Sequence, residues 1–309
     1  MPDMMMQTLH EIGVESARKQ PGMIDALTED APILAMIKWI KATHGLWNVA
    51  EKLNDITAPA FVHFDAPLPS LGVSTDLVTT DLQKMGGEME VPTDRAEKFG
   101  GAVKYFARKQ DYILKKAGMD TEIVIVMQNL LKGAMVEKNL YDAGGSGKGY
   151  FILACRFDPE LNVGLYDADQ FAQGRLFNIS FPYGGQEHLL RSKKYEGVYG
   201  YSVLYRAHFG YQLLDARRTV AAIVNIDEDH HPSVDMIDDM LAQVRAQPGS
   251  THIFCGPRGR IYGLNPWKTE NIHLVNGDTD AKTRIETWNG IGITTSYNIA
   301  EKIDHVTVK

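Results

Sequence analysis

Five consecutive residues, Asp227 to His231, place carboxylates beside imidazoles and are the first candidates for chemistry. Both side-chain types suit several divalent metal ions. A metal site, however, usually draws its ligands from several elements, and adjacent residues of an extended chain point apart. The sequence holds no second cluster of such residues. We therefore expect a solvated turn, with its acids near the positive end of a following helix, and no bound metal.

The glycine-rich run 144–149 (GGSGKG) is similar to a phosphate-binding loop. That motif needs a glycine five residues before its Gly-Lys pair, and a Ser or Thr after the lysine. This chain has Asp142 and Gly149 at those positions, so the hydroxyl that would bind Mg²⁺ is missing. The residues before the run also predict a helix rather than a strand. We expect a flexible connector here and no nucleotide cofactor.

Candidates for nucleophilic catalysis are weak. His252 and Cys255 are close in sequence, but they lie in a strand pattern, where residues three apart face opposite sides. The chain contains no Gly-x-Ser-x-Gly elbow. Its two cysteines, Cys155 and Cys255, allow neither a disulfide framework nor zinc-finger spacing. We expect buried free thiols and no catalytic residue.

Composition limits the possible partners. The 309 residues carry a net charge of −7 and the pI is about 5.8. Tight binding to nucleic-acid phosphates needs a basic surface, so this charge argues against it. The N-terminus lacks the pattern of a signal peptide. The densest apolar run, Ile123 to Met127, is too short to span a bilayer, and we expect no membrane partner.

The stretch 200–227 carries the strongest pattern in the chain. Up to Leu213 its odd positions are aromatic or apolar and its even positions mostly polar, which is the period of a half-buried strand. The pattern breaks at Asp215 and restarts on a second apolar run. We expect two long antiparallel strands around a turn near Asp215. Beside this turn, Arg217 and Arg218 are suited to contact phosphates or a neighbouring subunit, or to pair with carboxylates of the same chain.

Further elements follow from apolar spacing and from capping and turn residues. The predicted helices are a short one capped by Thr8 to Glu11, one after Pro32 that includes Ile40, two long runs at 94–117 and 120–138 separated near Gly118, and one at 233–244. A hairpin is predicted where 251–255 and 260–264 flank Gly256 to Gly259, and a last strand at 290–299.

The region 49–92 differs in character from the rest, because it is rich in proline and glycine. Its strand-like pieces are Ala60 to Phe64 and Val73 to Leu82. Such a hairpin buries little apolar surface by itself, and an isolated hairpin is marginal in water. It therefore either packs across its own domain or projects and is ordered by a neighbouring molecule.

A family resemblance rests on several of these segments. The run 208–227 holds Phe209-Gly210, then Asp215-Ala216-Arg217, then Asn225-Ile226-Asp227. It resembles the signature of the major capsid proteins of tailed double-stranded-DNA bacteriophages, where an aromatic-Gly segment leads to Asp-x-Arg and a strand ending in Asn-Ile. Residues 286–293 (ETWNGIGI) are similar to the late Gly-Ile-Pro-Ile strand of that family, with Gly292 in place of proline. Residues 8–11 and 21–34 resemble its N-terminal arm.

The resemblance implies an α+β fold of the Hong Kong 97 type. Its parts are an N-terminal arm at 1–48, an extended β-hairpin loop at 49–92, a peripheral domain with a long spine helix at 93–143, and an axial α/β domain at 144–309. The axial segment also contributes strands to the peripheral domain, among them the long strands at about 200–227.

The resemblance also implies a function. Such a chain is a structural subunit, not an enzyme, that assembles as hexamers and pentamers into the icosahedral shell of a virion. Assembly takes place in the host cytoplasm, and the shell encloses double-stranded DNA without sequence-specific binding. The implied partners are copies of the chain, a scaffolding protein, a portal and a decoration protein, with no cofactor. The candidate intersubunit contacts are Phe61, Phe64, Leu68, Leu71, Val73, Leu77, Arg217 and Arg218.

Two alternatives remain open on the sequence. One is a soluble, metal-dependent α/β enzyme that uses the run from Asp227 to His231. The other is a ring-forming component of a phage tail.

Overall fold

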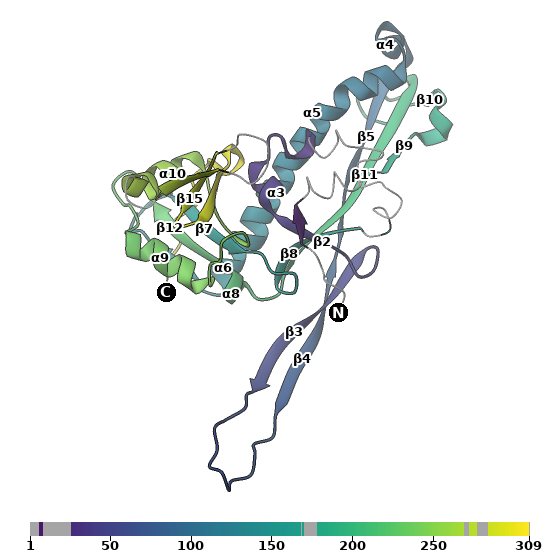
Figure 1. Cartoon of the computed structure of the whole chain (residues 1–309). Helices are drawn as coiled ribbons and strands as arrows, with labels where there is room; N and C mark the ends of the chain where they lie inside the picture. Colours follow the sequence, from purple (N-terminus) through teal and green to yellow (C-terminus); the bar gives the residue numbers. More distant parts are fainter. Residues whose placement is uncertain are drawn as a thin grey trace.

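The structure is a computed structural model that describes residues 6–8, 26–167, 169, 178–268, 272–276 and 284–308, with backbone only at 273–276 and 284–285. Most of the predicted capping box lies outside these residues, and Thr8 belongs to the two-residue strand β1 (Gln7–Thr8). Within the described residues, no helix is both long and apolar enough to cross a membrane. The chain combines helices with two large sheets whose strands pair mainly antiparallel, which confirms the α+β class (Figure 1).

A long helical rod connects the two sheets. It follows the short helix α4 (Thr93–Lys98) and consists of α5 (Ala102–Ile123), a π-helical segment η1 (Val124–Leu131) and α6 (Lys132–Val136). At 1.5 Å per residue the rod is about 50 Å long. The predicted break near Gly118 is wrong. A Cβ at Gly118 would lie 1.8 Å from the carbonyl oxygen of Leu27, so this glycine permits close packing rather than ending the helix.

The first sheet is organised around one strand of 15 residues, β11 (Tyr199–Leu213). One edge of β11 pairs antiparallel with β5 (Gln83–Pro92). The other edge pairs with β8, β9 and β10. Odd positions of β11, such as Val203 and Tyr205, are buried in one cluster with Phe106 and Leu114 of α5. The alternation therefore predicted correctly which face of this strand is buried.

The bounds of the remaining strands of this sheet are β2 (Lys38–Lys41), β8 (Asn162–Tyr166), β9 (Asn178–Ser180) and β10 (His188–Leu189). Strand β2 follows α3 (Pro32–Met36), so the predicted helix after Pro32 ends before Ile40. A single-turn segment, η2 (Pro182–Gly185), precedes β10.

The second sheet has the order β14-β15-β16-β13-β7-β12-β6. Its strands are β6 (Leu140–Asp142), β7 (Tyr150–Arg156), β12 (Val220–Ile226), β13 (Thr251–Cys255), β14 (Ile272–Asn276), β15 (Arg284–Trp288) and β16 (Ile291–Thr295). Helices α9 (Val234–Gln243) and α10 (Pro257–Gly263) cover one face, and η1 covers the other.

Three predictions for this half of the chain are wrong. Strands β11 and β12 do not pair with each other, because the short helix α8 (Ala216–Thr219) carries the chain from the first sheet into the second. The residues predicted as a hairpin around Gly256 form β13 followed by α10. The last strand ends at Thr295, and a 3₁₀ turn, η4 (Tyr297–Ile299), follows it. A similar turn, η3 (Asn265–Trp267), follows α10.

A bulge in β12 lets both faces of this strand stay apolar. Val224 belongs to the cluster with η1, whereas Ile226 belongs to the cluster with α9, although the two lie two positions apart. The register shifts between Ile223 and Ile226, and Asn225 has φ of 58°, a conformation that Asn tolerates better than most residues. Its side-chain amide donates 2.8 Å hydrogen bonds to Asp142 Oδ1 and to the carbonyl of Val306, which fixes the end of the chain on this sheet.

A buried carboxylate joins three distant segments to the rod. Glu122 in α5 is fully buried, and its Oε2 accepts hydrogen bonds from the backbone N–H groups of Ile33 (2.8 Å) and Leu34 (3.0 Å). Its Oε1 accepts from the side chains of Ser296 and Asn298. One side chain thus fixes α3, the rod and the segment after β16 to one another.

Candidate intersubunit contact surfaces

The most exposed part of the described chain is a long hairpin that projects from the body (Figure 1). Strand β3 (Trp47–Thr57) pairs antiparallel with β4 (Gly72–Asp81), from Trp47 opposite Asp81 to Thr57 opposite Gly72. The sequence predicted a strand at Ala60 to Phe64, but these residues lie in the loop between the two strands. The hairpin itself ends at Asp81, and the rest of the predicted loop region forms β5 in the first sheet.

The root of the hairpin is firmly held. The side-chain amide of Asn48 donates to Gln212 Oε1 on β11 (2.6 Å), and both side chains are buried. Asn48 Oδ1 also accepts from the backbone N–H of Thr43 at 3.0 Å. On the other strand, the N–H of Leu82 donates to the carbonyl of Leu46 at 2.9 Å. The base therefore has a fixed direction, set by β11.

Beyond the root, every residue from Glu51 to Leu77 is exposed. The rings of Phe61 and Phe64 are as accessible as in an extended chain, at 110% and 105%. All six apolar contact candidates lie here, and further large exposed apolar residues sit beside them: Leu53, Ile56 and Val62. Many large apolar side chains exposed on one element mark a site of interaction, because a monomer gains nothing by exposing them.

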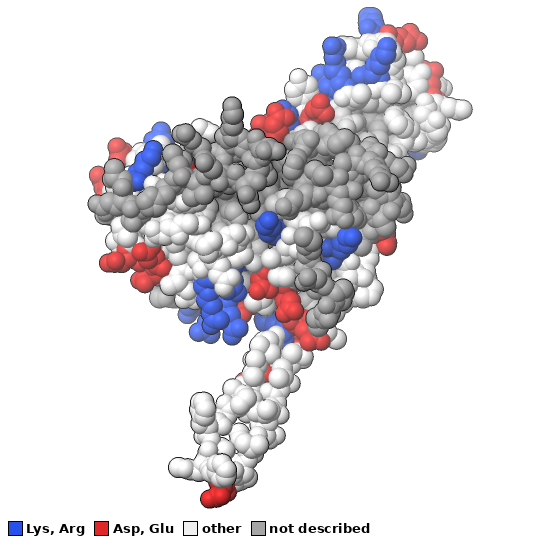
Figure 2. All heavy atoms as spheres, in the orientation of Figure 1, with Lys and Arg blue, Asp and Glu red and all other residues white. Residues whose placement is uncertain are grey.

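The charged side chains of the hairpin beyond Lys52 are all acidic. Between Lys52 and Lys84 the sequence has no Lys or Arg, and its only charged side chains are Asp55, Asp65, Asp76 and Asp81. In Figure 2 the hairpin is mostly uncharged, with an acidic tip. A surface that is both apolar and acidic fits a partner with apolar hollows and basic groups.

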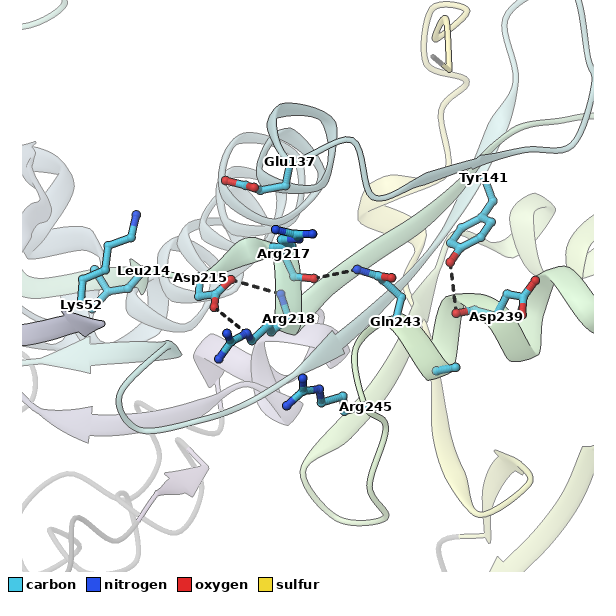
Figure 3. A pocket seen from close by; sticks show the side chains of 11 residues that line it. Lys52, Glu137, Tyr141, Leu214, Asp215, Arg217, Arg218, Asp239, Gln243 and Arg245 are labelled. Atoms are coloured by element: carbon cyan, nitrogen blue, oxygen red, sulfur yellow. Dashed lines mark hydrogen bonds and ion pairs between the residues drawn. The ribbon is translucent and has the colours of Figure 1, made fainter. Parts of the chain in front are cut away.

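A basic pocket of about 800 Å³ lies beside the root of the hairpin (Figure 3). Arg217 and Arg218 on α8 form one side, Lys52 of β3 another, and Gln243 and Arg245 at the end of α9 a third. Figure 2 shows basic atoms gathered on this edge of the body, next to the hairpin. The structure thus places the two predicted arginines together with basic residues from distant parts of the chain.

The short helix α8 is held rigidly under this pocket. Asp215 caps it by accepting from the N–H of Arg218 at 3.2 Å. The buried side-chain amide of Asn139 donates to the carbonyls of Arg217 (2.8 Å) and Val220 (2.9 Å). Gln243 Nε2 also donates to the carbonyl of Arg217 at 3.1 Å (Figure 3). The guanidinium groups therefore project from a fixed backbone.

The charges of the pocket are only partly paired. Arg218 forms an ion pair with Asp215, with Nε 3.4 Å from Oδ2, as one of the sequence alternatives predicted. Among the described residues, Arg217, Arg245 and Lys52 have no carboxylate within ion-pair distance. Glu137 and Asp239 also line the pocket. The unpaired cations make it a suitable receptor for an acidic surface.

The run from Asp227 to His231 forms a compact turn before α9, as predicted. Asp227 Oδ1 accepts from the backbone N–H of His230 (2.9 Å) and lies 2.7 Å from His230 Nδ1. The side-chain hydrogen bond with His230 lowers the pKa of Asp227. His231 Nδ1 lies 2.6 Å from the carbonyl oxygen of Tyr262. In the described ranges, no group of three His, Cys, Asp or Glu side chains is placed to hold a metal ion.

The glycine-rich run differs from the prediction in one respect. A strand, β6, precedes it rather than a helix. However, β7 follows it, whereas a phosphate-binding loop opens a helix. Lys148 forms an ion pair with Asp304 at 2.9 Å, so its ammonium group is already engaged.

Both cysteines are buried free thiols, as predicted. Burial raises the pKa of Cys155 to about 12 and that of Cys255 to about 11. Burial also lowers the pKa of His252 to about 4. At neutral pH these groups are uncharged, which favours packing over nucleophilic chemistry.

No protein-family model and no curated protein matches the sequence of this chain. Among the solved structures that resemble it are the following two, each matched over most of its length. A chain in the cryo-EM structure of bacteriophage Epsilon15 is 12% identical, with 88% of this chain and 87% of that chain covered and a TM-score of 0.51. A chain of the bacteriophage JBD30 capsid is 9% identical, with coverage of 84% and 88% and a TM-score of 0.50. At these identities the likeness concerns the fold.

Proposed function

We propose that this chain, which has the Hong Kong 97-like fold of phage capsid proteins, is the structural subunit of an icosahedral phage shell. The observation that carries the proposal is the hairpin, which is fixed at its root and apolar and exposed beyond it. A two-stranded hairpin without a core of its own is marginal in water. It gains stability when a neighbouring subunit covers it.

In this proposal the parts of the chain have distinct roles. The segment before β3 is the arm, and its strands β1 and β2 join the first sheet. The β3–β4 hairpin is the extended loop. The rod is the spine helix of the peripheral domain, and the first sheet belongs to the same domain. The second sheet and its helices form the axial domain. The hairpin and the basic pocket are different surfaces, so their use between copies gives head-to-tail contacts, which close into rings when the rotation allows.

Several modest contacts per subunit are sufficient for a shell. Once one contact has formed, the others form at high effective concentration, and their free energies combine. The subunits would assemble as hexamers and pentamers in the host cytoplasm, with a scaffolding protein, a portal and a decoration protein as further partners. The net charge of −7 suits a wall that encloses DNA without binding it tightly.

The basic pocket provides a test of the proposed contacts. We expect the double variant Arg217→Glu and Arg245→Glu to need at least about tenfold more protein to assemble, because like charges across an interface cost several kcal/mol. The matched control, Arg217→Lys with Arg245→Lys, keeps the charge and should assemble as the wild type does. Light scattering against concentration measures the difference. Equal assembly of wild type and charge-reversed variant would remove the pocket from the set of contacts.

A further inference from the structure

A small apolar cavity of about 180 Å³ lies between the rod and the first sheet. Met85 and Met89 of β5 form one wall, Ile113, Leu114 and Ala117 of α5 form another, and Tyr205 of β11 forms the floor. Burial raises the pKa of Tyr205 to about 12, which agrees with the apolar character of this place. Strand β5 has its second edge open here, because within the described residues it pairs only with β11.

The cavity exists because one wall position lacks a side chain. Gly87 lies between Met85 and Met89 on the face of β5 that meets α5, opposite Tyr205. A Cβ added at Gly87 would meet nothing within 4 Å. The neighbouring Gly86 is different, since a Cβ there would lie 2.1 Å from the carbonyl oxygen of Tyr205. Close approach of the β11 backbone therefore requires a glycine at position 86. No such contact requires a glycine at position 87.

The cavity has the size and the lining of a site for one phenyl ring. An apolar protein cavity of about 150 Å³ binds benzene, so 180 Å³ accommodates a phenylalanine ring. Methionine side chains adapt their shape and make favourable contacts between sulfur and aromatic rings. A ring that enters between Met85 and Met89 would meet such contacts on both sides.

The chain itself has aromatic side chains that pack against no other residue of the subunit body. Phe61 and Phe64 at the end of the hairpin are fully exposed. They cannot reach the cavity of their own subunit, because the ten residues of β4 extend the tip about 33 Å from the root, away from α5 and β5 (Figure 1). The bonds of Asn48 to β11 fix that direction. A second copy is thus the molecule whose tip fits.

We infer that a tip phenylalanine, Phe61 or Phe64, of a second copy inserts its ring into the cavity between α5 and β5. This inference rests on the proposed function, since it requires contact between copies, and it names the receptor of the hairpin. Tip and cavity are different surfaces, so each subunit offers both and the contact propagates head to tail.

Filling the cavity from within tests the inference. Gly87→Leu should fold with an unchanged melting temperature, because the new side chain enters open space in a strand without a positive φ. It should raise the protein concentration needed for assembly about tenfold or more. The matched control Lys84→Leu adds the same side chain to the same strand, outside the lining, and should assemble as the wild type does.

A cross-linking experiment measures the contact directly. Copies that carry Phe64→Cys, or in a second preparation Phe61→Cys, are assembled with copies that carry Gly87→Cys and treated with a short thiol-specific cross-linker. We expect dimers only in the mixture, because the native Cys155 and Cys255 are fully buried. The preparation that gives dimers identifies the inserted ring.

The outcomes separate this inference from the proposed function. If the wild type forms particles, Gly87→Leu forms them equally well and neither mixture cross-links, the inserted ring is refuted while the shell proposal stands. If the wild type forms no particles under any condition, the proposed function fails and this inference fails with it.

Discussion

Replacement of residues 58–71 by an Asn-Gly turn should give a folded subunit that no longer assembles. Thr57 and Gly72 are paired across the hairpin, so a two-residue turn can join them without a change of register. All the removed residues are exposed. We therefore expect the free energy of unfolding to change by no more than about 0.5 kcal/mol, as for other surface changes.

The effect on assembly should be large. The deletion removes Phe61, Phe64 and Leu68, and each buried apolar side chain of this size contributes about 1.5–3 kcal/mol at a contact. A loss of at least about 4 kcal/mol per subunit corresponds to roughly a thousandfold higher concentration for assembly. Size exclusion with light scattering, beside a thermal melt, measures both quantities.

A polar double variant of the same loop, His63→Gln with Ser70→Asn, is the control and should assemble normally. Normal particles from the deletion would show that the hairpin tip is not a contact between copies.

Replacement of Glu122 by alanine should be the most destabilising single change outside the hydrophobic core. The carboxylate is fully buried and accepts hydrogen bonds from Ile33, Leu34, Ser296 and Asn298. Removal of this acceptor leaves buried donors without a partner, which costs about 1–3 kcal/mol for each unsatisfied group. We expect a loss of about 3–5 kcal/mol of unfolding free energy.

Chemical denaturation measures this loss, and two variants serve as comparisons. Glu122→Gln keeps the shape and one carbonyl acceptor, so its loss should be smaller. Asp120→Ala, two positions away, removes only an exposed ion pair with Lys116 and should cost less than about 1 kcal/mol. An unfolding free energy of Glu122→Ala equal to that of the wild type would contradict the role of this carboxylate in joining α3, the rod and the segment after β16.

The sequence predicts which face of a strand is buried better than it predicts which strands pair with each other. The alternation up to Leu213 identified the buried face of β11, because the period of side chains in a strand is a local property. The partner strand is not local: β11 pairs with β5 and β8, and β12 pairs with β7 in the other sheet. A turn signal at Asp215 suggests a hairpin, but a four-residue helix gives the same break in the pattern.

Glycine led to two wrong predictions of where an element ends, because its role in this chain also depends on residues far away in sequence. Near Gly118 it suggested the end of a helix, whereas the structure uses the missing Cβ to bring Leu27 close. In the run from Gly256 to Gly259 it suggested a turn, whereas Pro257 begins α10. At Gly118 and at Gly256, the carbonyl of a residue far away in sequence, Leu27 or Ile299, lies where a Cβ would be.

The contact surfaces were partly predictable. The lack of apolar partners in the region 49–92 left a projecting hairpin as one of two alternatives. The absence of Lys and Arg between Lys52 and Lys84 could have indicated its acidic character. Arg217 and Arg218 were identified as an adjacent pair. Their neighbours Lys52 and Arg245 come from β3 and from the end of α9, and no sequence spacing connects them to α8.

The most direct test of the central claim is electron microscopy of the purified wild-type chain over a series of concentrations. The account predicts closed icosahedral shells, built from rings of five and six copies, that appear above a threshold concentration. A chain that remains monomeric throughout the series, and also when it is co-expressed with the phage assembly partners, would contradict the claim that it is a shell-forming subunit.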